Sequence, residues 1–252
     1  MRKLIAFLLL SVIIFTSCNK VGKNEFRVNG NFTNGNNKVL YLFEMTPNGF
    51  QALDTINIDE DGSFKFKHEY KEPTIYVLSS GGNDYITFIP SAKEDIELKA
   101  QFNALSSSYT VKNSPQSQLL HDLNQEYIKT NSVLNELKQT LHDNKFEPNI
   151  EEIKKKLFEQ YNLLELHQRE YIKKFVTKNK GSISSIIALY RTFDNHYLFS
   201  LKNDLDVYVD VYNELNKIHP NNPHTIGLKT LIEKAKKEQN QAQELASQND
   251  KK

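Results

Sequence analysis

Cys18 is the only thiol in the 252-residue chain. A single cysteine excludes a disulfide framework, a cysteine-based zinc site and a Cys-x-x-Cys redox pair. Cys18 follows the small residues Thr16 and Ser17, directly after a hydrophobic run. An unpaired cysteine in an exported chain needs an explanation.

The segment before Cys18 has the pattern of an export signal. Met1-Arg2-Lys3 is basic, and in the twelve residues from Leu4 to Phe15 only Ser11 is polar. Twelve helical residues span about 18 Å, which is too short for a hydrocarbon core of roughly 30 Å. We therefore predict a signal peptide over residues 1–17 rather than a membrane-spanning helix.

The run Phe15-Thr16-Ser17-Cys18 resembles a bacterial lipoprotein lipobox, with Phe15 where leucine is usual. The resemblance implies cleavage before Cys18, a covalent lipid on the Cys18 sulfur and acylation of the new amino group, so the membrane is the first expected partner. The alternative is an ordinary secretory signal with a chance cysteine. Residues 18–25 then form a tether without an acidic residue before Glu25. Because similar lipoproteins are often sorted by the residues just after the cysteine, the resemblance implies an outer membrane, facing the periplasm, rather than the cell surface.

Other residues with chemical potential have simpler interpretations. Asn57, Asp59, Asp61 and Gly62 match the first positions of an EF-hand loop, but position 12 is His68, which cannot replace the bidentate glutamate. A hairpin turn is the better interpretation of this loop.

The histidines give no recognisable metal site. His219 and His224 bracket a proline turn, and His167 with Glu170 lacks the further acidic ligands of a dinuclear site. No Gly-x-Ser-x-Gly elbow is present, and residues 79–83 are expected to form a loop. We therefore predict no metal, no cofactor beyond the lipid and no catalytic residue. The balance of 32 Lys and Arg against 31 Asp and Glu also argues against a nucleic-acid partner.

Residues 26–112 have the pattern of about eight short strands. Turn signals recur every eight to twelve residues, among them Asn34-Gly35, which predicts a hairpin, and Pro47-Asn48-Gly49. Along residues 64–70, aromatic residues alternate with charged ones, which indicates one buried and one solvated face. These features favour an antiparallel β-sandwich or open barrel.

From Ser114-Pro115 the apolar spacing becomes helical. Two long amphipathic stretches, separated by the loop 142–148, predict a helical hairpin, with Asn149 and Glu152 placed for a capping box. Further helices are expected from Ser182, from Ser200 and after Pro223. The predicted fold is therefore α+β, with the β domain followed by an all-α region over residues 113–238 and a polar tail over residues 239–252.

The runs Phe26-Arg27-Val28-Asn29-Gly30-Asn31-Phe32, Lys38-Val39-Leu40-Tyr41-Leu42 and Asp61-Gly62-Ser63-Phe64 resemble a small β domain of unknown function. That domain stands at the N-terminus of anchored bacterial lipoproteins, ahead of a thioredoxin-like thiol-disulfide oxidoreductase domain. Ser114-Pro115-Gln116, Ser182, Ser185 and His219-Pro220-Asn221-Asn222-Pro223 extend the resemblance into the helices. No residue here matches the two redox cysteines, so the oxidoreductase activity is not expected.

Three functional hypotheses follow. The first is a membrane-anchored envelope lipoprotein that acts as a non-catalytic binding or scaffold module for an envelope protein or ligand. The second is an accessory or truncated member of the oxidoreductase lipoprotein family, without its catalytic domain. The third is an enzyme built from scattered residues, which a cleft with several strongly shifted titratable groups would favour.

Overall fold

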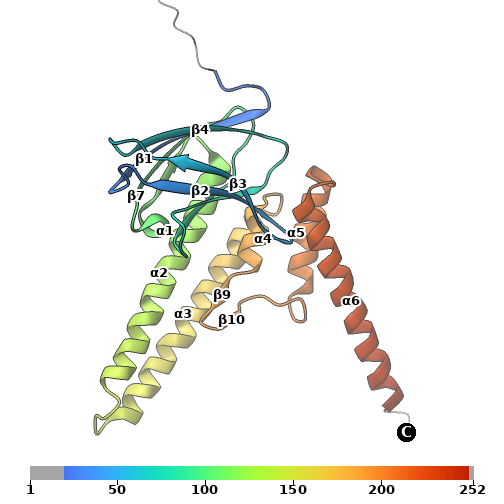
Figure 1. The fold of residues 1–252 in the computed structure, drawn as a ribbon. Helices are drawn as coiled ribbons and strands as arrows, with labels where there is room; N and C mark the ends of the chain where they lie inside the picture. Colours follow the sequence, from blue (N-terminus) through green and yellow to red (C-terminus); the bar gives the residue numbers. More distant parts are fainter. Residues whose placement is uncertain (1–19, 250–252) are drawn as a thin grey trace, which may run out of the picture.

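The computed structural model describes residues 20–249 and shows an α+β fold (Figure 1). The predicted leader and Cys18 lie outside the described residues. All eight predicted strands are present. They are β1 (Glu25–Thr33), β2 (Val39–Thr46), β3 (Gly49–Asn57), β4 (Ser63–Glu69), β5 (Ile75–Ser79), β6 (Tyr85–Phe88), β7 (Asp95–Gln101) and β8 (Thr110–Lys112).

The strands form two open four-stranded sheets, in the orders β4-β1-β7-β8 and β3-β2-β5-β6. All pairs are antiparallel except β1 with β7, which run parallel with Val28 opposite Ile96. The inner faces of both sheets contribute to one hydrophobic core, which includes Phe26 and Phe32 from the first sheet and Leu40 and Phe88 from the second. The β domain is therefore a sandwich, as the alternating pattern indicated.

Two predicted hairpins are wrong. The turn at Asn34-Gly35 joins β1 to β2, which belong to different sheets, and Asn34 rather than Gly35 adopts a positive φ of 61°. The turn through Asp61 and Gly62 likewise crosses from β3 in one sheet to β4 in the other. Gly62 has a φ of 83°, and a Cβ there would lie 2.7 Å from Phe32 O, so this crossing requires glycine.

The helical region begins with the predicted hairpin, formed by α2 (Pro115–Asp143) and α3 (Ile150–Lys178). Leu134 is buried, but Leu141 near the far end is 39% exposed. The predicted stripe is therefore covered only over its near half, because two helices alone cannot enclose it beyond the rest of the molecule. Figure 1 shows this far end projecting away from the β domain.

The predicted capping interactions differ from those observed. Asn149 makes no side-chain cap, and the Glu152 carboxylate pairs with Lys156 at 2.7 Å instead of reaching back to Asn149. Ser114, at the N-cap position of α2, makes no side-chain cap hydrogen bond, and its Oγ donates to Ile89 O in the β domain at 3.4 Å. Ser117 Oγ accepts the N–H of Ile89 at 3.1 Å, so the start of α2 is joined to the sandwich.

The remaining described elements are four helices and two short strands. They are α1 (Leu105–Ser108), α4 (Ser184–Leu189), the two-residue strands β9 (Thr192–Phe193) and β10 (His196–Tyr197), α5 (Leu205–Ile218) and α6 (Pro223–Asn249). The sequence indicated neither α1 nor the β9–β10 pair. The helix expected from Ser200 begins five residues later, because the carboxylate of Asp204 accepts the Ser200 N–H at 2.9 Å and holds the preceding residues in a turn.

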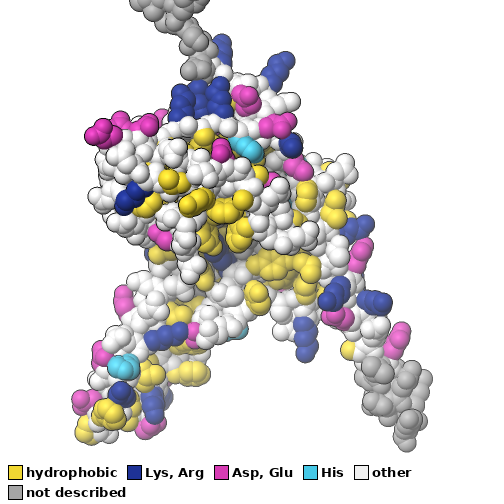
Figure 2. Space-filling model, viewed as in Figure 1, with side chains coloured by type: hydrophobic (Ala, Val, Ile, Leu, Met, Phe, Trp, Pro, Cys, Tyr) yellow, Lys and Arg dark blue, Asp and Glu magenta, His cyan; other side chains and the backbone are white. Residues whose placement is uncertain are grey.

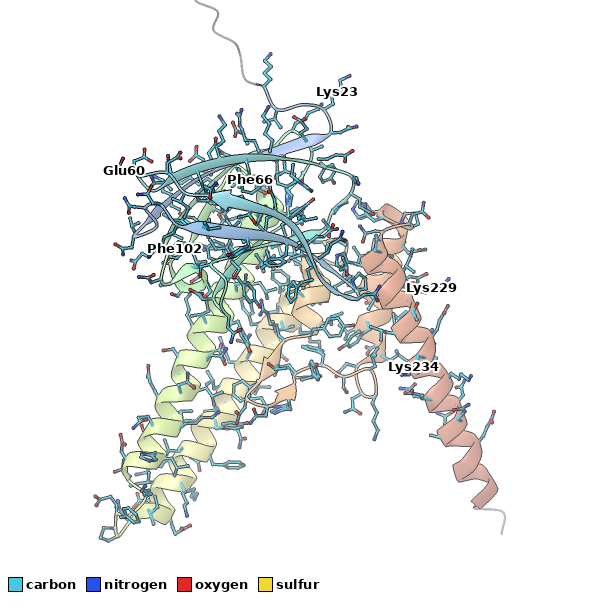
Figure 3. The ribbon with its side chains drawn as sticks, in the orientation of Figure 1. Lys23, Glu60, Phe66, Phe102, Lys229 and Lys234 are labelled. Atoms are coloured by element: carbon cyan, nitrogen blue, oxygen red, sulfur yellow. The ribbon has the colours of Figure 1, made fainter. Side chains whose placement is uncertain are left out.

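The polar stretch expected from residue 239 is helical as far as Asn249, where α6 ends. This stretch is rich in Gln, Ala and Glu, which favour helix, and Gln239 Nε2 donates to Leu201 O at 3.3 Å. Lys229 and Lys234 of α6 (Figure 3) are exposed to solvent and lie within ion-pair distance of Glu233 and Glu238. Within residues 20–249 no helix is both long and apolar enough to span a membrane.

Candidate functional site

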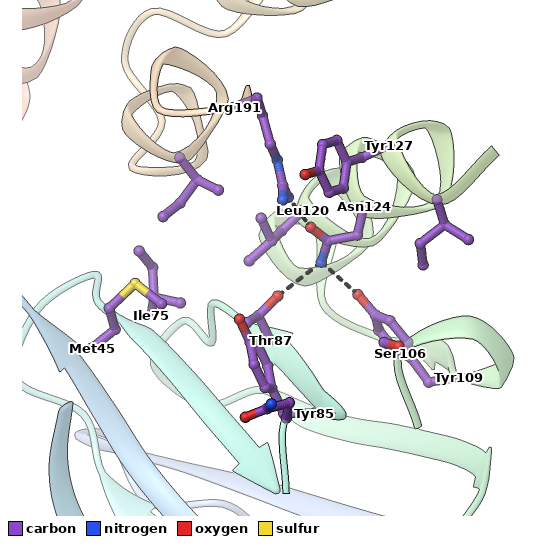
Figure 4. A pocket seen from close by; sticks show the side chains of 13 residues that line it. Met45, Ile75, Tyr85, Thr87, Ser106, Tyr109, Leu120, Asn124, Tyr127 and Arg191 are labelled. Atoms are coloured by element: carbon purple, nitrogen blue, oxygen red, sulfur yellow. Dashed lines mark hydrogen bonds between the residues drawn. The ribbon is translucent and has the colours of Figure 1, made fainter. Parts of the chain in front are cut away.

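A cavity of about 290 Å³ lies where the β domain meets the helices, and we call it the Arg191 cavity. Figure 2 shows hydrophobic side chains gathered around a hollow in this part of the surface. Its walls come from the sandwich, α1, α2 and the segment after α4 (Figure 4). Its polar lining consists of Asn83, Tyr85, Thr87, Ser106, Tyr109, Asn124, Tyr127 and Arg191. A concave site with several converging polar groups is the usual form of a small-molecule site.

Arg191 is the only charged side chain that lines this cavity among the described residues. Its guanidinium lies over the Tyr127 ring, with Cζ 4.6 Å from the ring centroid, and its Nη2 donates to Asn124 Oδ1. The Nε atom is shielded from solvent and has no hydrogen-bond partner among the residues described. Burial lowers the pKa of the Arg191 guanidinium below its usual value, yet a guanidinium stays charged at neutral pH.

Asn124 is held so that its amide oxygen faces Arg191 (Figure 4). Its Nδ2 donates to Thr87 Oγ1 at 2.8 Å and to the Tyr109 hydroxyl oxygen at 3.1 Å. These two hydrogen bonds fix the orientation of the amide. The position of the guanidinium is therefore set by contacts that reach from α2 into the β domain.

Tyr109 supplies a neutral hydroxyl to the same network. Burial raises the pKa of the Tyr109 phenol to about 12, so it is protonated throughout the physiological range. Its ring packs edge-on against His121, with centroids 4.7 Å apart. The cavity thus combines one cation with uncharged polar groups.

The other two arginines within residues 20–249 have carboxylate partners. Arg27 Nε donates to Asp95 Oδ1 at 2.7 Å. Arg169 pairs with Asp204, donates to Leu198 O and lies over the Phe199 ring at 4.4 Å. Arg191 shares the contact with an aromatic ring but has no carboxylate within ion-pair distance in the described part of the chain. A buried charge without a counter-ion is costly, and an anion bound in the cavity would supply one.

The predicted site residues do not gather at this cavity. Asp61 accepts the backbone N–H of Ser63 at 2.9 Å in an exposed turn. His167 and Glu170 are exposed on α3. No group of three or more His, Cys, Asp or Glu side chains suited to a metal ion occurs among residues 20–249.

His224 has a structural role at the start of α6. It is 8% exposed, and its Nε2 lies 3.2 Å from Thr74 Oγ1 at the edge of the β domain. The neighbouring Asn222 donates through Nδ2 to Glu72 Oε2 and Pro73 O, both at 2.8 Å. The resemblance over residues 219–223 therefore falls on the contact that joins α6 to the sandwich.

Stability should fall as the pH is lowered through the region below about 6.5, because burial lowers the pKa of His224 in the folded state. The unfolded chain then binds the proton more readily than the folded one, which reduces the free energy of unfolding by at most about 1.4 kcal/mol per pH unit. Urea unfolding of wild type, His224→Gln and the exposed-site control His142→Gln between pH 7 and 5 measures this. Only His224→Gln should reduce the change in the free energy of unfolding with pH. If that change is equal in all three proteins, His224 is not the group responsible.

Sequence reasoning missed Arg191, Asn124 and Tyr109, because no local motif joins positions so far apart. One signal was present: arginine is rare in this chain, at four positions, while its other cations are lysines. Because arginine suits buried anion pairing better than lysine, each arginine was a candidate for a specific contact.

Residues 26–120 match the model of a family described as a domain of unknown function (DUF4369). The match covers the sandwich and the first residues of α2, and it confirms the resemblance of this region to a domain of unknown function. No curated protein and no solved structure matches the chain.

Proposed function

We propose that this chain is a membrane-anchored lipoprotein of the cell envelope that acts as a non-catalytic binding module, with the Arg191 cavity as its ligand site. The observation that carries the proposal is the charge of Arg191, which is partly buried beside an aromatic ring and has no carboxylate partner among the described residues. A ligand with a carboxylate or phosphate group would pair with the Arg191 guanidinium, which lines the cavity. The conclusion is a binding site for an anionic group.

The geometry of the chain supports anchoring through Cys18. The described chain begins at Lys20, and the nearby Lys23 lies on the side of the β domain away from the helical hairpin (Figure 3). A lipid on Cys18 would hold the sandwich nearest the membrane, which is expected to be the outer membrane on its periplasmic side. The far end of α2 and α3 would then point away from it.

The experiment compares Arg191→Met with Arg169→Met in the full chain, with acetate and phosphate as probes against chloride at equal ionic strength. Acetate or phosphate at about ten times its Kd should stabilise wild type by about 1.4 kcal/mol. Arg191→Met should lose that effect. The stabilisation by each anion is measured relative to the same variant without the anion, because the substitution also leaves Asn124 Oδ1 without its donor.

Arg169→Met is the matched control. It should lower stability by about 1–3 kcal/mol, because Asp204 then loses its partner, and it should keep the anion effect. Stabilisation by acetate or phosphate that is equal in wild type and Arg191→Met would contradict the proposal, as would no stabilisation of wild type by either anion.

The second candidate is an accessory role beside a separate thioredoxin-like chain. The match over residues 26–120 favours it, because the β domain that this chain resembles stands ahead of such domains in other lipoproteins. Purification of the full chain from detergent-solubilised envelopes should then recover a thioredoxin-like protein, and its absence would remove this candidate.

A further inference from the structure

A second cavity, of about 470 Å³, adjoins the Arg191 cavity and has a different lining. Its walls are largely apolar and come from α4, the first turns of α6 and the turn between β2 and β3. The apolar side chains that define it are Pro47, Ile186, Ile187, Tyr190, Leu228 and Leu231. We call it the α4–α6 groove.

The two cavities meet at shared side chains. Met45, Ile75 and Ile187 line both of them. Ile75 is fully buried and forms a fixed part of this boundary, whereas Met45 is only partly buried. Methionine is unbranched and adapts its shape readily, so it can border a passage that an apolar chain fills.

Charge divides the combined site into two ends. Arg191 supplies the only charged side chain lining the first cavity within residues 20–249, and the described lining of the groove carries no Asp, Glu, Lys or Arg. The lysines of α6 that Figure 3 labels, Lys229 and Lys234, are exposed to solvent and are not among the described residues that line the groove. One end therefore suits an anion, and the other suits an aliphatic chain, which gains free energy by leaving water.

We propose that the site binds a single-chain amphiphile, with its anionic head against Arg191 and its aliphatic chain past Met45 in the α4–α6 groove. This rests on the proposed function, because the head occupies the anion site described above. The two volumes together lie in the range of pockets that hold ligands of such a size, roughly 300–1,000 Å³. A small anion would leave the apolar groove unused.

Calorimetry on the full chain carrying Cys18→Ser, which removes the lipid acceptor, tests the proposal with four probes. Octanoate and monooctyl phosphate carry both a chain and an anionic head, acetate has only the head, and 1-octanol has only the chain. The expected Kd of octanoate or of octyl phosphate is at least tenfold lower than those of acetate and octanol. The stronger of the two anions identifies the head group as carboxylate or phosphate.

Two variants locate the head and the chain. Arg191→Met should raise the Kd of octanoate at least tenfold. A Cβ on Gly227 would lie 3.2 Å from Pro47 Cβ, so the larger side chain of Gly227→Leu should fill the groove. This variant should bind octanoate no more tightly than it binds acetate. Lys229→Leu changes a residue of α6 that does not line the groove, so it is the control and should leave the affinities for octanoate and acetate unchanged. Leu231→Gln, at a partly exposed groove position, gives a second chain-end variant and should weaken octanoate but not acetate.

The outcomes separate the two proposals. Equal, Arg191-dependent affinities for acetate and octanoate would overturn the amphiphile and leave the anion site standing. An affinity for octanol equal to that for octanoate would overturn the placement of the head, as would octanoate binding that is unchanged in Arg191→Met. Octanoate binding unchanged in both Gly227→Leu and Leu231→Gln would overturn the placement of the chain. No binding of any anionic probe would overturn the amphiphile and the anion site together.

Discussion

Cys18→Ser should move the protein from the membrane fraction to the soluble fraction, or leave an uncleaved precursor. Serine lacks the sulfur to which the lipid is attached, and each acyl methylene that no longer enters the bilayer removes about 0.8 kcal/mol of membrane affinity. Fractionation of cells, followed by intact-mass spectrometry of the mature chain, measures both outcomes.

Lys20→Ser is the matched control, because it changes the same tether and leaves the cysteine in place. It should fractionate as wild type does, with the mass of a lipidated chain. If Cys18→Ser stays in the membrane at the mature mass, or if wild type carries a bare thiol, then the interpretation of Cys18 as a lipid site is wrong.

Phe64→Ala should lower the free energy of unfolding by about 3–5 kcal/mol. Phe64 is 3% exposed, and its ring meets Phe32 edge-on, with centroids 4.8 Å apart and an interplanar angle of 83°. The ring also lies over Gly30, where a Cβ would come within 1.9 Å of Phe64 Cζ. Removal of the ring therefore leaves a cavity at the centre of the sandwich.

Phe50→Ala provides the comparison within the same domain, since Phe50 is 60% exposed on β3. Phe50→Ala should lower the free energy of unfolding by less than about 1 kcal/mol, because folding removes little of the Phe50 side chain from water. Denaturant unfolding of the two variants measures the difference. Equal midpoints for Phe64→Ala and Phe50→Ala would contradict the assignment of Phe64 to the core.

The strands and the helical hairpin could be predicted because their patterns are local. Alternation along residues 64–70 and the apolar spacing of α2 each reflect one buried face of one element. The pairing of the strands could not be predicted in this way. β1 and β2 are neighbours in the sequence, yet β1 pairs with β4 and β7, and a turn signal such as Asn34-Gly35 is the same whether the chain returns in its own sheet or crosses to another.

The candidate site could not be predicted because it exists only after the two regions pack. Thr87 in β6, Asn124 in α2 and Arg191 after α4 form one network, although more than thirty residues separate each from the next. Pattern reasoning likewise identified Asn222 and His224 as part of a turn, but not their contacts with the β4–β5 loop. The export signal and Cys18 are the opposite case, since that prediction comes entirely from a local run of residues outside the described structure.

The central claim, that Arg191 binds an anion, can be measured at the Nε–H of Arg191 itself. The chain has four arginines, so a ¹⁵N spectrum of the arginine side chains is simple, and Arg191→Lys identifies the signal. Titration with octanoate should shift the Arg191 Nε signal in a saturable way and leave that of Arg169, which already pairs with Asp204, unchanged. An Arg191 signal that stays in place at saturating octanoate and at saturating acetate would contradict the account.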